Sequence, residues 1–363
     1  MSLEGVLAPE GWVTASDAGG RFHALFGRDG LITALQVLPR RPEVAAATLR
    51  ALAARLGEGD DPVWDEEPGK VPHEVRPGPL ELLGLRSEGD WVFYGGADQT
   101  PLFLHLLVAT GDRVLAAELE PAWRAAGGWL ARAVAEGDGL VRFARRAPGG
   151  LVHQGWRDTD DPGGPSGGGL PGDPAAPVAD ADTQAAALAG ARAWTALTGD
   201  DALERRVRAA VAAAFGPETL AIGGDGRAVE GAGSHTARLL WAGAWDGAAR
   251  DAAAARCCAP DVLTDWGVRT LSSEHPAFRE DAYHRGSIWP FDCWFAWGGL
   301  RAAGHAEEAE RVRAGVRAAV AQLGGAPELY AAGPRRLAIA CEVQAWTAGA
   351  LEAWDDDWDG RTW

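Results

Sequence analysis

Three carboxylates in the sequence have neighbours that suit proton transfer. Asp158 follows Trp156 and Arg157 directly. The apolar flank of Trp156 would raise the pKa of the Asp158 carboxyl by desolvation, whereas Arg157 would lower it if the guanidinium points inward. A general acid requires the first effect to be the larger one. Asp158 is therefore a candidate general acid.

Glu328 and Glu342 are the two candidates for a general base. Glu328 lies in a loop between Pro327 and an apolar pair, with no helix to explain its charge. Glu342 lies at the start of a helix expected over 343–354, where the helix dipole lowers its pKa whether or not it does chemistry. Either glutamate could also be a structural ion-pair partner. The residues alone leave both open as the base, and the family resemblance described below favours Glu328, with Glu342 as the alternative.

Several motifs combine charged and aromatic residues in a way that suits hydroxyl-rich ligands. Arg28 and Asp29 precede the first apolar helical run, where Asp29 could equally be an N-cap. Thr100 is expected to cap a helix that begins at Pro101, which leaves Asp98 unexplained. The segment 64–76 holds six charged side chains and a histidine, and could also be a solvated loop. The candidate substrate-binding residues in these motifs are Arg28, Asp29, Trp64, Glu67, Lys70, His73, Glu74, Asp98, Trp156 and Arg157, and the family resemblance described below adds His284 and Trp289.

The amino-acid composition narrows the classes of molecule that this protein could bind. The formal net charge of −17 repels nucleic acids and anionic membranes. No apolar run approaches the ~18 to 20 residues that span a bilayer, and the N-terminus lacks a leader pattern, so we expect a cytoplasmic protein. The 17 tryptophans outnumber the nine phenylalanines and three tyrosines. Flat indole faces suit the CH surfaces of sugar rings, although tryptophan also fills helix interfaces.

The sequence contains no pattern typical of a cofactor or metal enzyme. The four cysteines form neither a disulfide ladder nor a CxxC pair, and the eight histidines show no ligand spacing. Walker A and HExxH are missing from the sequence, and its GxSxG and GxGxxG matches, at 164–168 and 167–172, fall in a Gly- and Pro-rich stretch without the strand-turn-helix pattern that those motifs require. We expect no metal and no organic cofactor, and we expect the cysteines to be reduced core residues.

Alanine-rich segments with apolar spacing of three and four predict an all-α protein. Short Gly or Gly-Asp breaks join many of these segments, as expected for helical hairpins. Six hairpins of ~60 residues would fill the chain, which favours one toroidal domain over residues 1–363 with small β additions at 88–93 and 140–143. The predicted helices are 42–57, 101–111, 113–136, 183–199, 200–215, 235–245, 287–304, 305–324 and 341–354.

Eight motifs together resemble the amylo-α-1,6-glucosidase domain of glycogen debranching enzymes and its bacterial relatives. They occur in that family's order between residues 26 and 346. The motifs are Phe26-Gly27-Arg28-Asp29, the segment 65–74, Asp98 with Thr100-Pro101, Gln154-Gly155-Trp156-Arg157-Asp158, the segment 266–273, Tyr283-His284-Arg285-Gly286-Ser287-Ile288-Trp289-Pro290, Pro327-Glu328-Leu329 and Gln344-Ala345-Trp346.

The resemblance implies an (α/α)6 toroid with a sugar pocket at one end of its inner helices, and an inverting mechanism. It assigns the general acid to Asp158 and the general base to Glu328, and it has Arg28 and Asp29 hold the hydroxyls of a terminal glucose. The implied activity is release of terminal glucose from α-glucosidic linkages, including α-1,6 branch points of glycogen-like or shorter glucans.

The sequence also departs from the family pattern. The segment 179–185 replaces a Glu-Val-Gln-Gly-Tyr-like motif. This departure keeps open a catalytically weak glycan-binding protein. A sugar epimerase on the same toroid is a further alternative, in which His73, His235 and His284 would supply the acid and base.

Overall fold

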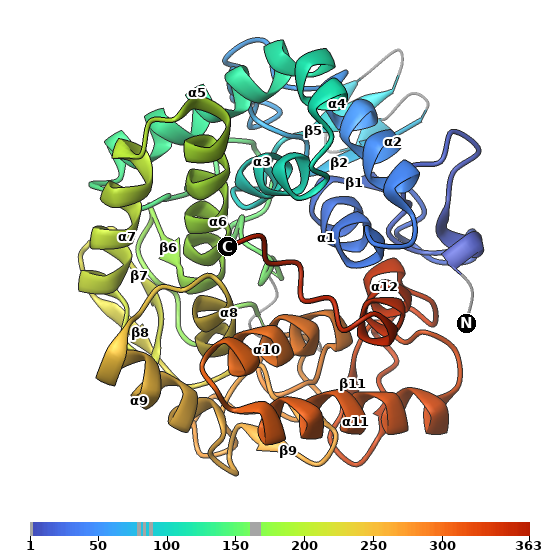
Figure 1. The fold of residues 1–363 in the computed structure, drawn as a ribbon, viewed down its shortest axis with the longest axis vertical. Coiled ribbons are helices and arrows are strands. Elements are labelled where there is room, and N and C mark those ends of the chain that lie inside the picture. Colours follow the sequence, from blue (N-terminus) through green and yellow to red (C-terminus); the bar gives the residue numbers. More distant parts are fainter. Residues whose placement is uncertain (1–2, 78–80, 83–84, 87–89, 160–167) are drawn as a thin grey trace.

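Six helices stand side by side in a ring at the centre of the structure (Figure 1). The computed structural model describes residues 3–77, 81–82, 85–86, 90–159 and 168–363. Each inner helix contacts the next, and the first contacts the last, so the ring is closed. The inner helices are α1 (Gly27–Val37), α3 (Gln99–Ala109), α6 (Ala181–Thr198), α8 (Ser234–Trp241), α10 (Pro290–Ala302) and α12 (Ala345–Asp355).

A second layer of helices surrounds this ring and returns the chain to the start of each inner helix. Outer helices bury one face and expose the other, whereas every residue of α1 is buried. The predicted all-α toroid of helical hairpins is confirmed. The outer helices are α2 (Pro42–Ala53), α4 (Arg113–Glu118), α5 (Glu120–Glu136), α7 (Ala202–Ala214), α9 (Gly247–Cys257) and α11 (Ala306–Leu323). The helix η1 (Leu3–Val6) contacts α12, the last inner helix.

Several element boundaries differ from the sequence-based expectation. The helical run expected after Asp29 is α1, which begins at Gly27, so Asp29 lies inside the helix and is not its N-cap. The prediction omitted α9, and the helix expected over 113–136 is divided into α4 and α5 near Pro121. The helix expected from 341 begins at Ala345. Thr100 is not an N-cap, because α3 already begins at Gln99. The Thr100 hydroxyl instead accepts a hydrogen bond from the Val71 N–H, which ties the loop before β2 to α3.

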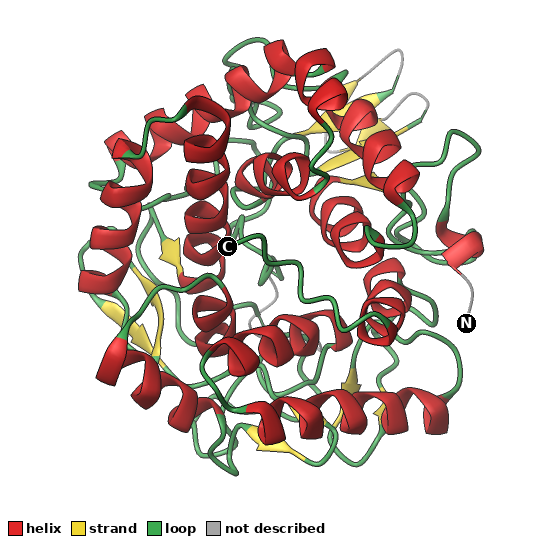
Figure 2. Cartoon of the chain, viewed as in Figure 1, coloured by secondary structure: helices red, strands yellow, loops and turns green. Residues whose placement is uncertain are grey.

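Short strands decorate the loops around the ring (Figure 2). Three-stranded antiparallel sheets have the orders β1-β2-β5 and β6-β7-β8. The hairpins β3-β4, β9-β10 and β11-β12 are two-stranded. The strands are β1 (Leu25–Phe26), β2 (Glu74–Arg76), β3 (Glu81–Leu82), β4 (Leu85–Arg86), β5 (Trp91–Phe93), β6 (Ala179–Asp180), β7 (Thr219–Ile222), β8 (Ala228–Glu230), β9 (Leu263–Thr264), β10 (Gly267–Val268), β11 (Tyr330–Ala331) and β12 (Arg335–Arg336).

The two strands predicted from the sequence have different outcomes. The first, 88–93, contains β5, and its residues 88 and 89 lie outside the described part. The second, 140–143, is wrong: only Phe143 makes an isolated bridge, to Val178. The Gln184 side chain bonds both the N–H and the C=O of Val141 and so takes the place of a neighbouring strand.

The C-terminal residues 356–363 cross the ring at the C-terminal ends of the inner helices and end over its centre (Figure 1). Their carbonyls accept hydrogen bonds from three side chains inside the ring. Trp241 donates to Asp359 at 2.7 Å, Trp294 to Trp358 at 2.8 Å, and the His105 Nε2 bonds Gly360 at 2.9 Å. This tail therefore closes the end of the ring opposite the inner-helix N-termini.

Truncation after Asp355 should destabilise the fold by about 3 kcal/mol, since each of three buried donors loses a partner worth ~1 kcal/mol. Urea unfolding followed by both fluorescence and circular dichroism measures this loss. A chain lacking only residues 361–363 keeps the three bonds and is the control. Equal stability of the longer truncation and the full chain would contradict a closing role for the tail.

No helix in the described ranges combines the length and apolar character needed to cross a membrane.

Candidate active site

The N-terminal ends of α1, α10 and α12, together with neighbouring loops, line a cavity of about 210 Å³. This volume is below the ~300 to 1,000 Å³ of pockets for drug-sized ligands, so it suits one small ring. The positive ends of the helix dipoles point toward it, which favours carboxylates there. The lining residues are Phe22, Phe26, Arg28, Asp29, His73, Glu74, Leu151, Trp156, Asp158, Tyr283, His284, Trp289, Glu328, Gln344 and Trp346.

Two glycines allow the backbone to bring these side chains together. Gly27 begins α1 and donates its N–H to the carbonyl of His73 at 3.0 Å. A Cβ at Gly27 would lie 2.1 Å from the carbonyl oxygen of Pro72, so a larger residue would separate α1 from β2. A Cβ at Gly155 would lie 2.0 Å from the Asp180 carboxylate. Gly155 thus lets the segment that carries Asp158 lie against the start of α6.

Arg28 connects two carboxylates at the base of the cavity. Its Nε donates to Asp98 at 2.7 Å and its Nη1 to Asp158 at 2.8 Å. The side chains of Arg28 and Asp98 are 4% and 2% exposed, whereas that of Asp158 is 23% exposed. Asp98 therefore lies below the cavity and orients Arg28, and Asp158 is the carboxylate that a ligand can reach.

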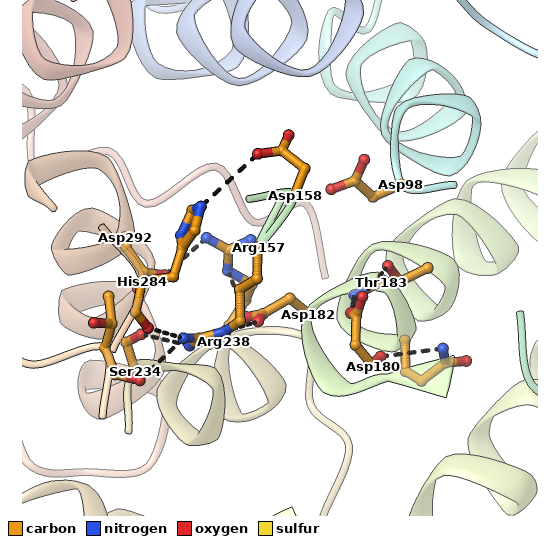
Figure 3. Close-up of polar contacts among 12 residues, drawn as sticks. Asp98, Arg157, Asp158, Asp180, Asp182, Thr183, Ser234, Arg238, His284 and Asp292 are labelled. Atoms are coloured by element: carbon orange, nitrogen blue, oxygen red, sulfur yellow. Dashed lines mark hydrogen bonds and ion pairs between the residues drawn. The ribbon is translucent and has the colours of Figure 1, made fainter. Parts of the chain in front are cut away.

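His284 and Arg28 together set the charge of Asp158. Burial raises the pKa of Asp158, but His284 and the positive charge of Arg28 outweigh it and hold that pKa well below its usual range. Burial lowers the pKa of His284 to about 4, so this imidazole is neutral at pH 7. The His284 Nε2 lies 3.8 Å from the nearer Asp158 oxygen (Figure 3). His284 and the Arg28 ion pair thus keep Asp158 ionised in the ligand-free protein.

Glu328 and Asp29 titrate near neutrality. Burial raises the pKa of Glu328 to about 7, even though the Tyr283 hydroxyl donates to Oε1 and the Cys341 N–H donates to Oε2. Burial also raises the pKa of Asp29 to about 7, against the opposing effects of Arg28 and the Gln344 amide. A carboxylate with a pKa near 7 is suited to general base catalysis at neutral pH.

One wall of the cavity is aromatic. The Trp289 ring stacks on His284 with an interplanar angle of 3°, and Trp156 packs edge-on against both rings. Trp346 extends this wall and approaches Trp289 at 5.9 Å between ring centroids. The wall therefore offers flat apolar surface to a ligand within a site otherwise rich in charge.

Several polar atoms of the cavity residues are buried and have no hydrogen-bond partner among the described residues. They include Arg28 Nη2, Trp156 Nε1, Gln344 Oε1 and Trp346 Nε1. A buried unpaired polar group costs ~1 to 3 kcal/mol, so such groups are expected where a ligand supplies the partner. Three donors and an acceptor beside an aromatic wall match a ring that carries several hydroxyls.

Arg157 points away from Asp158. It bonds Asp182 at 3.0 Å and the carbonyl of His284 at 2.9 Å, and Asp182 in turn faces Arg238 at 3.4 Å (Figure 3). This buried network supports the cavity from below and fixes the backbone of His284. None of the residues 179–185 lines the cavity, so the segment that departs from the sequence pattern lies beneath it.

Five predicted substrate-binding residues lie outside the cavity: Trp64, Glu67, Lys70, Asp98 and Arg157. The Lys70 ammonium is buried and bonds Glu67 at 3.1 Å, which ties the loop to itself. The rings of Trp64 and Trp91 are stacked, with their centroids 6.4 Å apart. The other seven line the cavity: Arg28, Asp29, His73, Glu74, Trp156, His284 and Trp289.

The two glutamates proposed as bases also differ in position. Glu328 lines the cavity and is 1% exposed, whereas Glu342 is exposed and borders a separate hollow beside residues 336–341. The prediction missed Tyr283, Gln344 and Trp346 as cavity residues. All three stand inside the quoted motifs, so those motifs were the signal that could have found them.

Sequence comparison identifies the family. Residues 105–331 match the mannosylglycerate hydrolase MGH1-like glycoside hydrolase domain. The chain belongs to this family. The MGH1-like match extends from α3 to β11 and includes Asp158 and Glu328. No curated protein matches the chain in sequence.

Solved structures share the MGH1-like fold. The GH63 mannosylglycerate hydrolase from Thermus thermophilus in complex with Tris matches with a TM-score of 0.71 and 16% identity, over 96% of this chain and 97% of that one. The same hydrolase in complex with glucose matches with a TM-score of 0.69 and 18% identity, over 95% and 96%. An uncharacterised conserved protein from that organism matches with a TM-score of 0.71 and 17% identity, over 97% of both chains. At these identities the likeness shows the fold alone.

Proposed function

We propose that this glycoside hydrolase inverts the anomeric centre and releases a terminal glucose from α-glucosides, including α-1,6-linked glucans and shorter glucosides. The observation that carries the proposal is the small cavity in which Asp158, Glu328 and Arg28 meet unpartnered hydrogen-bonding groups and an aromatic wall. A related fold binds glucose, in the Thermus thermophilus hydrolase. The small volume supports attack at a chain end rather than within a chain.

The proposed reaction is a single displacement. Asp158 donates its proton to the glycosidic oxygen as the bond to the anomeric carbon breaks. Glu328 accepts a proton from a water molecule, whose oxygen attacks the anomeric carbon from the opposite face. The products are β-glucose and the free alcohol, with Asp158 ionised and Glu328 protonated. Exchange with solvent then returns the proton to Asp158.

Substrate binding prepares the acid in this proposal. Arg28 keeps Asp158 ionised in the ligand-free protein, and its Nη2 has no partner there. A sugar hydroxyl that accepts from Arg28 draws the guanidinium away from Asp158. The pKa of Asp158 then rises because the opposing effect of burial remains.

Product analysis tests the proposal. We expect glucose release from isomaltose, maltose or glycogen, with β-glucose appearing first in the NMR spectrum. Isothermal titration with the same sugars separates the alternatives: binding without turnover would indicate a glycan-binding protein, and an exchanged sugar epimer would indicate an epimerase. Initial formation of α-glucose would contradict inversion.

A second candidate substrate is a glycoside whose aglycone carries a carboxylate. Arg21 is exposed beside the cavity residues Phe22 and Tyr283, with its guanidinium 4.5 Å and 5.9 Å from their ring centroids. The Thermus thermophilus relative is a mannosylglycerate hydrolase and was also solved with D-glycerate. Faster release of hexose from glucosylglycerate or mannosylglycerate than from isomaltose would favour this candidate. An Arg21→Gln variant should then lose that preference.

The pH dependence of kcat/KM should show an alkaline limb near pH 7. In the ligand-free protein, Asp158 and Glu328 together carry one proton when the pH is below about 7, because the pKa of Glu328 is about 7. The reaction requires that proton, placed on Asp158. Activity is therefore lost as pH rises through about 7, when the pair becomes doubly ionised, with ~10-fold loss per pH unit.

Tyr283→Phe provides the matched test of this assignment. The Tyr283 hydrogen bond lowers the pKa of Glu328, so its removal should raise that pKa and move the alkaline limb to higher pH. Phenylalanine keeps the ring that packs on Trp289. If the alkaline limb of kcat/KM stays at the same pH or moves to lower pH, the role of Glu328 is contradicted.

A further inference from the structure

Cys258, His305 and Glu308 lie together on the outer layer of the ring. Cys258 follows the end of α9, His305 precedes α11, and Glu308 lies in the first turn of α11. One sulfur, one ring nitrogen and one carboxylate oxygen from these side chains lie within 4.8 Å of one another. None of the three residues lines the sugar cavity.

We propose that these three side chains bind one Zn²⁺ ion. Zinc bonds of ~2.0 to 2.3 Å give a tetrahedron whose edges are about 3.4 to 3.6 Å. The His305 Nδ1 and the Glu308 Oε2 are 3.7 Å apart, close to such an edge and too far for a hydrogen bond. The Cys258 Sγ lies within 4.8 Å of both atoms, and metal binding would bring it to the ~3.6 Å edge.

The backbone holds the three ligands in place. His305 donates its N–H to the carbonyl of Leu300 at 2.9 Å, and Cys258 donates its N–H to Ala254 at 3.0 Å. His305 and Glu308 are three residues apart, a spacing that places two side chains on the same face of a helix. The site is therefore built from two helix ends that meet, which no local sequence spacing reveals.

Charge and donor type select the ion. A thiolate and a carboxylate together neutralise a divalent cation, and the third ligand is a neutral imidazole. Sulfur and nitrogen donors favour zinc over magnesium or calcium. The positive charge of Arg311 acts on Cys258. The Arg311 guanidinium also lies 3.8 Å from the Asp265 carboxylate, which offsets part of the positive charge near the site. The three side chains are each partly exposed, so an ion can enter and a water molecule can complete the tetrahedron.

Metal titration of the reduced, chelator-treated chain tests the site. One equivalent of Co²⁺ should produce a thiolate-to-cobalt absorption band, and Zn²⁺ should abolish that band by displacement. Cys258→Ser should remove the band and weaken Zn²⁺ binding by more than the ~100-fold typical of indirect partners. The control is Glu307→Gln, an exposed neighbour on the same turn, which should bind as the unmodified chain does. Equal binding by Cys258→Ser and the unmodified chain would overturn the proposal.

A second measurement needs no variant. Iodoacetamide labelling of the unmodified chain, mapped by mass spectrometry, should be slower at Cys258 when Zn²⁺ is present and recover with a chelator. An unchanged labelling rate would overturn the site. Because the site joins α9 to α11 outside the cavity, Asp158→Asn should bind Zn²⁺ normally, so this result does not depend on the proposed glycosidase function.

Discussion

Glu328→Ala should lower kcat on an α-glucoside by about 100- to 10,000-fold, the usual contribution of a general base. The variant lacks the only carboxylate that we assign to activate water, and the groups proposed to hold the sugar remain. KM should therefore change far less than kcat. Initial-rate assays on an activated α-glucosyl substrate measure the loss of kcat. An unfolding curve of the same variant shows whether its fold is retained.

Azide makes this prediction specific. In an inverting enzyme that lacks its base, a small anion can occupy the position of the attacking water and form β-glucosyl azide, which NMR identifies. We expect rescue of Glu328→Ala and no effect of azide on Glu342→Ala, because Glu342 is exposed and borders a different hollow. Rescue confined to Glu342→Ala would overturn the assignment of the base.

The helical architecture could be predicted because hairpins leave a local signature. Apolar spacing of three and four, ended by Gly199 or Gly304, marked helices that the structure contains. The omitted helix α9 lacks that signature, because it buries only two alanines and a cysteine. Periodicity therefore missed a helix that packs weakly, whereas it found α8, every residue of which is buried.

The site could be predicted only in part, because ring closure creates its contacts. Arg28 and Asp158 are 130 residues apart, and no local pattern shows that they pair. The sequence left open whether Arg157 points inward, and the partners that turn it away, Asp182 and the carbonyl of His284, come from other segments. In the loop before β2, His73 faces the cavity and Lys70 does not. Motif membership finds the loop, and the fold decides which side chains face the ligand.

Asp158→Asn should lower kcat on unactivated α-glucosides by about 100- to 10,000-fold and spare most of the rate on α-glucosyl fluoride. Asparagine keeps the size of the side chain and cannot donate the proton of a carboxylic acid. Fluoride leaves without that proton, so the base and the binding groups still act on this substrate. The measurement is the ratio of kcat/KM for the fluoride to that for isomaltose, which should rise by about the same factor as the loss.

Asp29→Asn is the matched comparison, since burial raises the pKa of Asp29 to about 7 and this carboxyl could carry the proton instead. Asp29 accepts a hydrogen bond from Gln344 at 2.9 Å, which fits a group that holds the sugar. If Asp29 binds and Asp158 donates, Asp29→Asn should slow both substrates to a similar extent. Selective sparing of the fluoride in Asp29→Asn, with equal losses in Asp158→Asn, would transfer the acid to Asp29. The Arg28 ion pair of Asp158 would then serve to keep a second charge near the developing oxocarbenium ion.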